Sequence, residues 1–565
     1  MKSFLLFFVN ITFLVVSVTG QTAKFINSIT HDKTNLGTPV SFMDMNSNVY
    51  TVGYSSRGDS ARVETTNETT SFRVDDEPTS YILKSDSNGA KLWLKTFGPN
   101  QHSFFKVESG AVDIDGNIYL IGSAKGRVDF QPGQGSKFDS IVGLQFALVK
   151  LNQNGVYLNH VAGSPISTNS GSNGTLIDIS ENGDIYAGGA VFGEVAIGDS
   201  TKNTLTSGSS TTGKAIIACY GNNLNLNWSF EVGDSLALIK ELKSHHDNSV
   251  TIAGRDAGSF DADPSTSVKN VGVNSNYVFV LRYSNLGKLM HAKQIGQEET
   301  PTTAHQFMMF KNGKMMILGN LYGTTDLDPG VGTKVYTGRV PFSVLLDENL
   351  DFVSSDTGIT HSMRPYLVEN VKNDGYTGFY TIGTFPVFLD FKNKTQMRSS
   401  SNNFSQLYQV EYDEEFNYIS EVVFPNGSDF IWMHSITMND NFILVGGKNS
   451  GEIILSPTLV KERSRRGQEY AFSFLLSNNG LKLSNERELP NRKLITIFPN
   501  PAMNTINFSG DLRFKKGLVK ALSGKVVMEV NSVNQSYDIS SLEPSIYLVE
   551  LINDESRTLI KFIKQ

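Results

Sequence analysis

The stretch DIDGNIYLIG, from Asp113 to Gly122, joins a tight turn to a short apolar strand that ends in glycine. Asp, Gly and Asn accept the left-handed backbone conformations that such a turn needs. Strands of this kind occur seven times, as NVYTVG, NIYLIG, DIYAGG, SVTIAG, KMMILG, GFYTIG and NFILVG, ending at Gly53, Gly122, Gly189, Gly254, Gly319, Gly383 and Gly446. Successive glycines are 69, 67, 65, 65, 64 and 63 residues apart. This narrow spread indicates a true internal repeat.

Each repeat contains four predicted strands. An apolar segment precedes the turn, and a variable loop after the glycine leads to a third strand such as QFALVKL (145–151). A second turn then leads to a fourth strand such as KLWLKTFG (91–98). Four-stranded units in tandem without helical periodicity favour an all-β fold, a seven-bladed β-propeller with blades of about 65 residues. A β-helix or open solenoid is the alternative, although its coils are shorter.

The segment AKFINSI (23–29) resembles an extra copy of the fourth strand. Phe25 precedes Gly53 by 28 residues, and Trp93 precedes Gly122 by 29. The segment either closes the ring by joining the last blade or forms an outer edge, and the sequence leaves both possibilities open.

Composition narrows the class of protein. The 565 residues are 39% hydrophobic and 19% charged, which is typical of globular, multi-domain chains. A net charge of −7 is mild for this length and argues against nucleic acid or an anionic membrane as partner. The one cysteine, Cys219, excludes an intrachain disulfide and is interpreted as a small core residue.

The N-terminus has the pattern of a signal peptide. Lys2 precedes an apolar run from Phe4 to Val18, and small residues follow up to Gly20. We predict a signal peptide over residues 1–20 with cleavage between Gly20 and Gln21. The run is shorter than the roughly 20 residues that span a bilayer, so no transmembrane segment is expected in the mature chain, which should lie outside the cytoplasm.

Acidic-proline motifs follow several of the repeat glycines, as DFQPG (129–133), DADPS (261–265) and DLDPG (326–330). Paired carboxylates can bind calcium, which makes Asp261, Asp263, Asp326 and Asp328 candidates. Calcium needs six or more oxygen ligands, however, and Asp, Pro and Gly also suit a plain turn, which is the preferred interpretation. No histidine pair has metal-ligand spacing, and no cofactor is expected.

Motifs of nucleophilic hydrolases, phosphate-binding loops and dinucleotide-binding folds do not occur in a strand-then-helix context. Catalytic propellers can carry acids around a central channel without leaving a motif, so an enzyme stays possible but is not favoured.

The repeat resembles the SBBP-type propeller repeats of bacterial surface and secreted proteins, in the turn, the Gly-ended strand and the acidic-proline motif. This resemblance covers roughly residues 25–490. It supports the architecture and transfers no binding specificity.

After the linker near 485–493 the pattern changes. The C-terminal segment resembles the type A sorting domain of the Bacteroidota type IX secretion system in four motifs that follow in order. The matching residues are Phe498, Pro499, Asn500 and Pro501, then Gly524 and Lys525, then Leu542 and Tyr547, and last the basic strand with Lys561 and Lys564. The pattern of short strands predicts a small Ig-like β-sandwich over residues 491–565, with the propeller over 21–490.

The resemblance implies recognition by the type IX translocon and sortase machinery, removal of the sorting domain, and a secreted or outer-membrane surface location reached through the periplasm. The first hypothesis for function is a binding or adhesion module for an extracellular glycan or protein. A glycan hydrolase or lyase with its site in the channel, and a structural part of a surface adhesion or motility layer, are the alternatives.

Overall fold

A computed structural model describes residues 23–357 apart from short gaps at 32–36, 38, 59, 99–102, 133–135, 199–203, 208–211, 235–236, 257, 273–276, 297–301 and 311–312. Beyond 357 it describes strands β29 to β46 and a few adjoining residues. All regular elements among these residues are strands, which confirms the all-β prediction. Within the same part of the chain, no helix is long and apolar enough to cross a membrane. The chain divides into two compact units, Met1–Leu481 and Lys482–Gln565.

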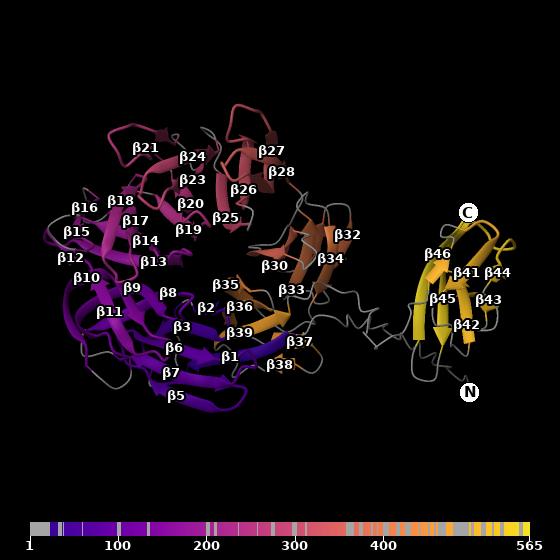
Figure 1. Ribbon diagram of the computed structural model, residues 1–565, viewed down its shortest axis with the longest axis horizontal. Coiled ribbons are helices and arrows are strands. Elements are labelled where there is room, and N and C mark those ends of the chain that lie inside the picture. The colour runs from indigo at the N-terminus through magenta and orange to yellow at the C-terminus, as the bar shows by residue number, and fades with distance from the viewer. Residues whose placement is uncertain are drawn as a thin grey trace, which may run out of the picture. The chain divides into compact units, whose positions relative to one another are not determined.

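Seven antiparallel sheets of four or more strands follow one another in the described part of the first unit, and we number them in chain order (Figure 1). Sheet 1 contains β2 (Val40–Met43), β3 (Val49–Ser55), β6 (Thr79–Ser85) and β7 (Lys91–Phe97). Sheet 2 contains β8 (Phe104–Val112), β9 (Ile118–Asp129), β10 (Phe138–Leu151) and β11 (Tyr157–Ala162). Sheet 3 contains β13 (Gly171–Ile179), β14 (Ile185–Phe192), β17 (Lys214–Tyr220) and β18 (Leu226–Val232). Sheet 4 contains β19 (Leu238–Ser244), β20 (Val250–Asp256), β23 (Tyr277–Tyr283) and β24 (Leu289–Ile295).

The remaining sheets continue the series. Sheet 5 contains β25 (Thr302–Met309), β26 (Met315–Asp326), β27 (Val335–Leu346) and β28 (Phe352–Asp356). Sheet 6 contains β29 (Tyr366–Val371), β30 (Thr377–Phe385), β33 (Gln406–Asp413) and β34 (Tyr418–Val423). Sheet 7 has the order β35 (Ile431–Met438), β36 (Phe442–Asn449), β39 (Tyr470–Ser477), β1 (Ala23–His31), β4 (Ser60–Thr65) and β5 (Thr69–Arg73).

Short strands lie between these elements. They are β12 (Ser164–Pro165), β15 (Glu194–Ala196), β16 (Thr204–Thr206), β21 (Phe260–Asp261), β22 (Asn270–Val271), β31 (Phe388–Phe391), β32 (Lys394–Arg398), β37 (Ile453–Ser456) and β38 (Leu459–Lys461).

The order of the sheets is cyclic. The first strand of each sheet contacts the sheet before it, and β2 of sheet 1 contacts β35 and β36 of sheet 7. The first strands lie nearest the middle of the unit, and the fourth strands lie at its outside (Figure 1). Apolar clusters fill the spaces between neighbours, for example between sheets 1 and 2 and between sheets 3 and 4. The arrangement is propeller-like.

Strand β1 decides between the two alternatives for residues 23–29. It pairs antiparallel with β39, with Ala23 opposite Leu476 and Thr30 opposite Tyr470. The N-terminal segment is thus the fourth strand of sheet 7 and closes the ring. Its other edge pairs with β4, so that the β4–β5 hairpin from the loop of sheet 1 extends the same sheet.

The contacts between the first and second strands explain why this position of the repeat is glycine. In sheets 2, 3, 4, 5 and 7 the first strand has a β-bulge opposite this glycine. A Cβ atom on Gly122 would lie 1.9 Å from the carbonyl oxygen of Lys106, and one on Gly189 would lie 1.9 Å from that of Asn173. Only glycine allows so close an approach of two backbones.

The second unit contains two antiparallel sheets. One has the order β40 (Thr496–Phe498), β41 (Thr505–Ser509), β44 (Ser536–Asp538), and the other β43 (Val526–Val530), β42 (Lys516–Ala521), β45 (Ser545–Ile552), β46 (Arg557–Lys564). Side chains from both sheets, including Ile506, Val519 and Phe562, form one buried cluster. This is the packing of a β-sandwich.

Candidate functional site

The turn between the first and second strands closes in the same way in sheets 1 to 5. In sheet 2 the Asp113 N–H donates to the Asn117 carbonyl, and the Gly116 N–H donates to the Asp113 carbonyl. The fourth residue of each turn has positive φ. Its first residues, which we call position 1, are Asp44, Asp113, Ser180, His245 and Phe310.

Position 1 is an architectural site in the first two sheets. The Asp44 carboxylate accepts hydrogen bonds from the Asn48 N–H and the Tyr50 hydroxyl, at 2.9 and 3.1 Å. Asp113 repeats this arrangement with Asn117 and Tyr119. In sheet 4, His245 instead bonds through Nε2 to the Thr251 hydroxyl at 2.6 Å. The His245 side chain therefore bonds within its own hairpin.

The next residue of each turn is not required by the turn. It is Met45 in sheet 1 and Ile114 in sheet 2, which are 76% and 78% exposed. In sheets 3 and 4 it is Glu181 and His246, and the His246 Nδ1 lies 2.5 Å from a Glu181 carboxylate oxygen. This contact joins two turns across the boundary between their sheets.

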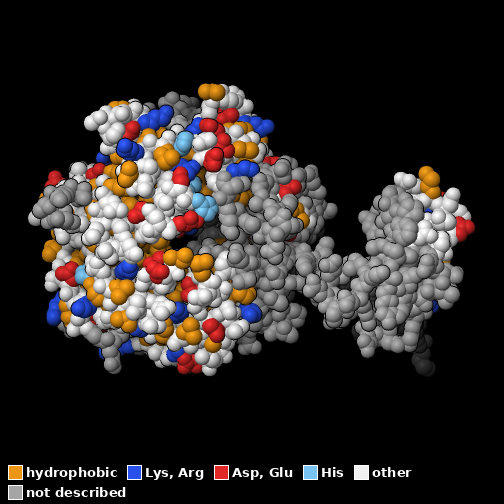
Figure 2. Space-filling model, viewed as in Figure 1, with side chains coloured by type: hydrophobic (Ala, Val, Ile, Leu, Met, Phe, Trp, Pro, Cys, Tyr) orange, Lys and Arg blue, Asp and Glu red, His pale blue; other side chains and the backbone are white. Residues whose placement is uncertain are grey.

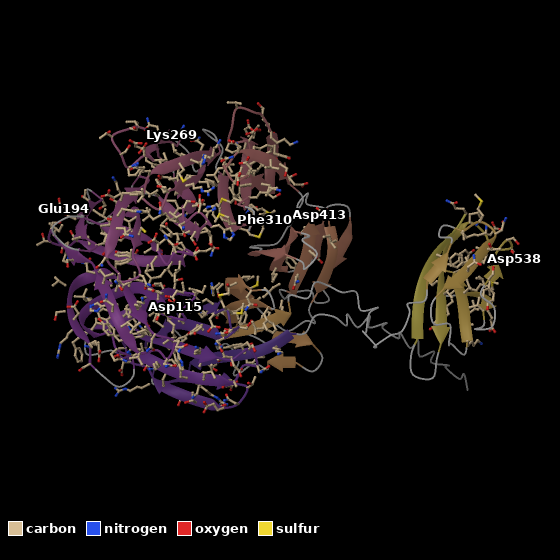
Figure 3. All side chains as sticks on the ribbon, in the orientation of Figure 1. Asp115, Glu194, Lys269, Phe310, Asp413 and Asp538 are labelled. Atoms are coloured by element: carbon tan, nitrogen blue, oxygen red, sulfur yellow. The ribbon has the colours of Figure 1, made fainter. Side chains whose placement is uncertain are left out.

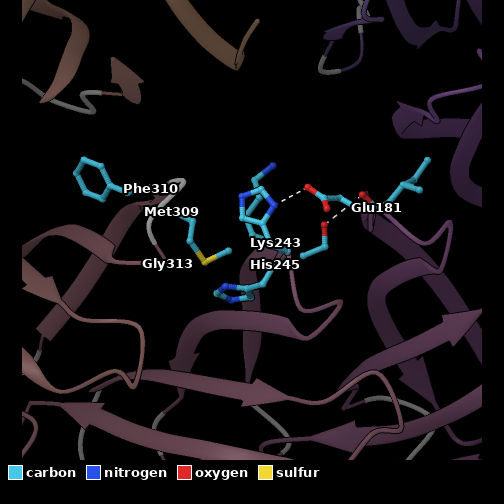
Figure 4. A pocket seen from close by; sticks show the side chains of 9 residues that line it. Glu181, Lys243, His245, Met309, Phe310 and Gly313 are labelled. Atoms are coloured by element: carbon cyan, nitrogen blue, oxygen red, sulfur yellow. Dashed lines mark hydrogen bonds and ion pairs between the residues drawn. The ribbon is translucent and has the colours of Figure 1, made fainter. Parts of the chain in front are cut away.

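A cavity of about 240 Å³ opens between the turns of sheets 3, 4 and 5. We call it the inner-turn site, and it is lined by Ile179, Glu181, Lys243, Ser244, His245, His246, Met309, Phe310 and Gly313. Figure 4 shows Phe310 and Met309 on one side of it and Glu181 on the other. Figure 2 shows a hollow near the middle of the first unit, with histidine and acidic side chains at its edge. Figure 3 shows Phe310 toward this middle and Glu194 and Lys269 at the outside.

Charged side chains of two first strands lie beside the cavity. Lys243 Nζ is 3.9 Å from a Glu241 carboxylate oxygen, and both residues belong to β19. Asp178, on the neighbouring β13, accepts hydrogen bonds at Oδ2 from the Ser244 N–H at 2.8 Å and the Ser244 hydroxyl at 2.9 Å.

Burial and two neighbouring charges determine the protonation of Glu241. Burial raises the pKa of Glu241 to about 7, Lys243 lowers it and the charge of Asp178 raises it further. The Glu241 side chain as a whole is 26% exposed. The charge of Asp178 has the largest effect on the pKa of Lys243 and raises it. Burial lowers this pKa and the charge of Glu241 raises it, so that it is raised overall. Glu241 is thus a carboxyl group that can exchange a proton near neutral pH.

His245 is uncharged at neutral pH. Burial lowers its pKa to about 4, and the Arg282 guanidinium acts in the same direction. The site therefore contains a neutral imidazole of His245 beside the more exposed pair of His246 and Glu181.

The four calcium candidates lie in two loops with the same hydrogen-bond pattern. The Asp261 carboxylate accepts from the backbone N–H groups of Asp263 and Lys269, and Asp326 accepts from those of Asp328 and Lys334. The second aspartates, Asp263 and Asp328, accept from the N–H groups of Ser265 and Gly330. The part of the chain that the structure describes contains no group of three or more His, Cys, Asp or Glu placed to hold a metal ion.

The sorting-signal residues belong to the second unit. Phe498 ends β40, and the Lys525 carbonyl accepts from the Ala521 N–H in the turn before β43. Tyr547 stacks on Phe562 at 5.5 Å, and Leu542 packs on the same cluster. Lys561 and Lys564 lie in the last strand, β46. Pro499, Asn500, Pro501 and Gly524 lie outside the described residues, as do Gly20 and Gln21 at the predicted signal cleavage.

The family described as "Secretion system C-terminal sorting domain" matches residues 496–565. The protein is therefore cargo of the type IX secretion system, interacts with that machinery, and is secreted or lies at the outer surface, which confirms the predicted location. No curated protein matches the chain.

Solved structures resemble the chain at low sequence identity. The polysaccharide lyase Uly1 aligns with a TM-score of 0.42 and 9% identity over 78% of this chain and 89% of its own. A PL25 ulvan lyase aligns with a TM-score of 0.39 and 11% identity over 76% and 93%. PorZ, an essential surface component of the type IX secretion system of Porphyromonas gingivalis, aligns with a TM-score of 0.29 and 10% identity over 94% and 75%.

Sequence reasoning missed the residues of the inner-turn site and the charged residues beside it. Asp178, Glu241 and Lys243 stand in no motif, and they come together only because β13 and β19 are neighbours. One signal was available. The segment LIKELKS (238–244) is a first strand with three charged residues, whereas the corresponding strand VSFM (40–43) has none.

Proposed function

We propose that this protein is a secreted or surface-displayed glycan-binding protein, and that the inner-turn site receives the glycan. In this proposal residues 1–20 are a signal peptide, residues 21–490 form a seven-bladed propeller of SBBP-like repeats, and residues 491–565 are a type A sorting domain removed after export. The cyclic order of the sheets and the closing strand β1 support the number of blades.

The observation that carries the proposal is the departure of three neighbouring turns from the architectural residues. Sheets 1 and 2 carry Asp at position 1 and an exposed apolar residue next to it. Sheets 3 and 4 carry Glu181 and His246 at this second position, and sheet 5 carries Phe310 at position 1, and all three side chains line a cavity. Since the turn itself closes identically in all five sheets, its geometry does not require these side chains.

The chemistry of the site suits a sugar. Glu181, Lys243, Ser244 and His246 supply donors and acceptors for hydroxyl groups. Met309 and Phe310 supply an apolar side against which the C–H groups of a sugar ring can pack. Ligand sites typically combine an apolar wall with a few polar groups in this way.

The proposal is tested by binding of the mature chain to immobilised neutral glycans. Lys243→Ala and His246→Ala should each weaken binding about 10-fold or more, which corresponds to about 1.4 kcal/mol. Ile114→Ala is the matched control, because it changes the same turn position in a sheet outside the cavity, and it should bind as the natural protein does. Binding unchanged in both site variants, or no binding to any glycan, would contradict the proposal.

A further inference from the structure

We propose that the inner-turn site recognises one class of sugar, a neutral pyranose with a single axial hydroxyl group, as in the galacto and manno configurations. The site binds this sugar with its apolar face toward sheet 5 and its axial hydroxyl group toward sheets 3 and 4. This inference rests on the proposed function, because it names the kind of glycan unit that the same site takes.

The lining of the inner-turn site is divided by sheet. Among the described residues, sheet 5 supplies Met309, Phe310 and Gly313, none of which has a polar side chain. Ile179 is the one apolar lining residue that sheets 3 and 4 supply within the same part of the chain. Figure 4 shows Phe310 and Met309 opposite Glu181. Sheets 3 and 4 supply every charged, imidazole and hydroxyl group of the lining, and these belong to Glu181, Lys243, Ser244, His245 and His246.

A site with one apolar and one polar side distinguishes sugars by their stereochemistry. A pyranose whose hydroxyl groups are all equatorial, such as β-glucose, carries them around the edge of the ring and exposes C–H groups on both faces. An axial hydroxyl group instead projects from one face and leaves the C–H groups of the opposite face uncovered. The second kind of ring matches the division of the lining, because it turns a polar face to one side and an apolar face to the other.

The size of the cavity limits the contact to one sugar unit. Its volume of about 240 Å³ lies below the roughly 300–1,000 Å³ of cavities that enclose drug-sized ligands. The other units of a glycan therefore lie outside the cavity, and selection among glycans depends on the configuration of the unit inside it.

Lys243 supplies hydrogen-bond donors on the polar side. Its Nζ atom lies 3.9 Å from a Glu241 carboxylate oxygen, which is beyond hydrogen-bond distance. No described residue accepts a hydrogen bond from this ammonium group. Its three N–H groups are thus available to the oxygen atom of a sugar hydroxyl group.

Glu181 supplies an acceptor on the same side. Its Oε1 atom lies 2.5 Å from His246 Nδ1, and no described residue donates to its Oε2 atom. A hydroxyl group both donates and accepts. The polar side therefore offers both kinds of partner that an axial hydroxyl group needs.

The charges at the cavity favour a neutral sugar. Lys243 interacts with the carboxylates of Glu241 and Asp178. His246 likewise lies against the Glu181 carboxylate. A carboxylate or sulfate group on the sugar would have to compete with these protein carboxylates for the same two side chains, whereas a hydroxyl group does not displace them.

The test compares pairs of glycosides that differ at one carbon atom. β-Galactoside with β-glucoside, and α-mannoside with α-glucoside, are coupled at equal density to a polyacrylamide carrier, and binding of the mature chain is measured by biolayer interferometry. In at least one pair the epimer with the axial hydroxyl group should bind about 10-fold more tightly, the effect expected of one hydrogen bond to a charged group. Glucosides that bind as tightly as both of these epimers would overturn the inference.

Variants on the two sides of the cavity locate the recognition. Lys243→Met keeps an aliphatic side chain but removes the donors, and Glu181→Gln removes the charged acceptor. At least one of them should bring the ratio of the two affinities close to 1. Met309→Ala is the matched control on the apolar side, and it should weaken both epimers by the same factor and leave the ratio unchanged. A ratio unchanged in both polar-side variants would contradict the inference.

The outcomes separate this inference from the proposed function. Binding to the glycosides without preference for an axial epimer, or binding only to other glycans, would overturn the inference and leave the glycan-binding proposal standing. Absence of binding to any glycan would count against the proposed function itself. The comparison of epimers on the natural protein decides the inference even where a variant does not fold.

Discussion

Individual Lys and Arg side chains link neighbouring sheets by hydrogen bonds. Lys84 donates to the Gln153 carbonyl in the second turn of sheet 2, at 3.2 Å, and lies 3.9 Å from the buried Asp44 carboxylate. Lys150 repeats this contact with the Asn222 carbonyl of sheet 3, at 2.9 Å. Arg282 does so with the Glu348 carbonyl of sheet 5. A residue of the third strand thus holds the next sheet at a fixed position.

Replacement of Lys84 by Met should destabilise the fold by about 1–3 kcal/mol, because Asp44 loses its buried cation and the Gln153 carbonyl loses its donor. The free energy of unfolding in urea measures the effect. The control is Arg73→Met, which removes a cation paired with Asp75 on the surface, where Arg73 is 83% exposed. We expect a change within about 0.5 kcal/mol there. Equal losses in the two variants would contradict the role of Lys84.

Glu241 should make stability depend on pH. Its pKa is raised from 4.5 to about 7 on folding, so between these values the folded state binds more protons than the unfolded state. Stability contributed at low pH is then lost as pH rises through 7, by up to about 3 kcal/mol. Glu241→Gln removes this term, so the variant should gain stability relative to the natural protein between pH 5 and pH 8. Parallel urea-denaturation curves over this range would show that the carboxyl group is not desolvated.

Strand β1 packs against residues of two sheets. Its Ile26 packs with Val49, Leu444 and Leu475, which belong to sheets 1 and 7. Ile29 packs with residues of β4, β5 and β6. Asn27 lies in a buried polar group in which its side-chain amide donates to the Thr51 hydroxyl at 3.0 Å. Strand β1 thus joins sheets 7 and 1, in addition to the contacts of β2 with β35 and β36.

Deletion of residues 23–31 should therefore open the boundary between sheets 7 and 1. We expect a lower urea midpoint and new cleavage by protease within β39, because two fully buried isoleucines and both ladders of β1 are lost. A synthetic peptide of residues 23–31, added to the truncated chain, should restore protease resistance, and a scrambled peptide should not. Resistance equal to that of the intact chain would show that β1 is a dispensable edge.

The elements were predictable from the sequence to different degrees. Each Gly-ended strand is the second strand of a sheet. These strands were predictable because their hydrophobic pattern and turn residues act locally. The added pairing of β4 with β1 is not visible in the sequence, because residues 60–73 fall within the variable loop that follows the repeat glycine. The bulges opposite the glycines depend on a partner strand and on tertiary register. The proximity of Glu241 to Asp178 could not be predicted, because it depends on the contact between β13 and β19.

On the scale of the whole molecule, the export signal and the proposed binding site belong to different units. The second unit carries the sorting-domain match, and the inner-turn site belongs to the first. The location could be predicted from the C-terminal motifs, because the secretion machinery recognises this segment by its sequence. The ligand could not be predicted from a motif, because most residues of the repeat form the strands and turns of the fold.

Removal of residues 496–565 should stop export and leave the protein in the periplasm of a host with a type IX secretion system. Cell fractionation with immunodetection measures this outcome. Fusion of residues 491–565 to a signal-peptide-bearing periplasmic reporter should have the opposite effect and carry the reporter to the surface or the medium. Export of the truncated chain at normal levels would contradict an exclusive role of this segment.

The pairing of Ala23 with Leu476 also has a mechanical consequence. Tension applied through the C-terminal segment during passage across the outer membrane would first reach β39, which ends at Ser477. This strand is bonded along both edges, to β36 and to β1, so a pull along its axis must break two ladders together in shear. The strand that closes the ring would therefore also act as an anchor that keeps the unit folded under load.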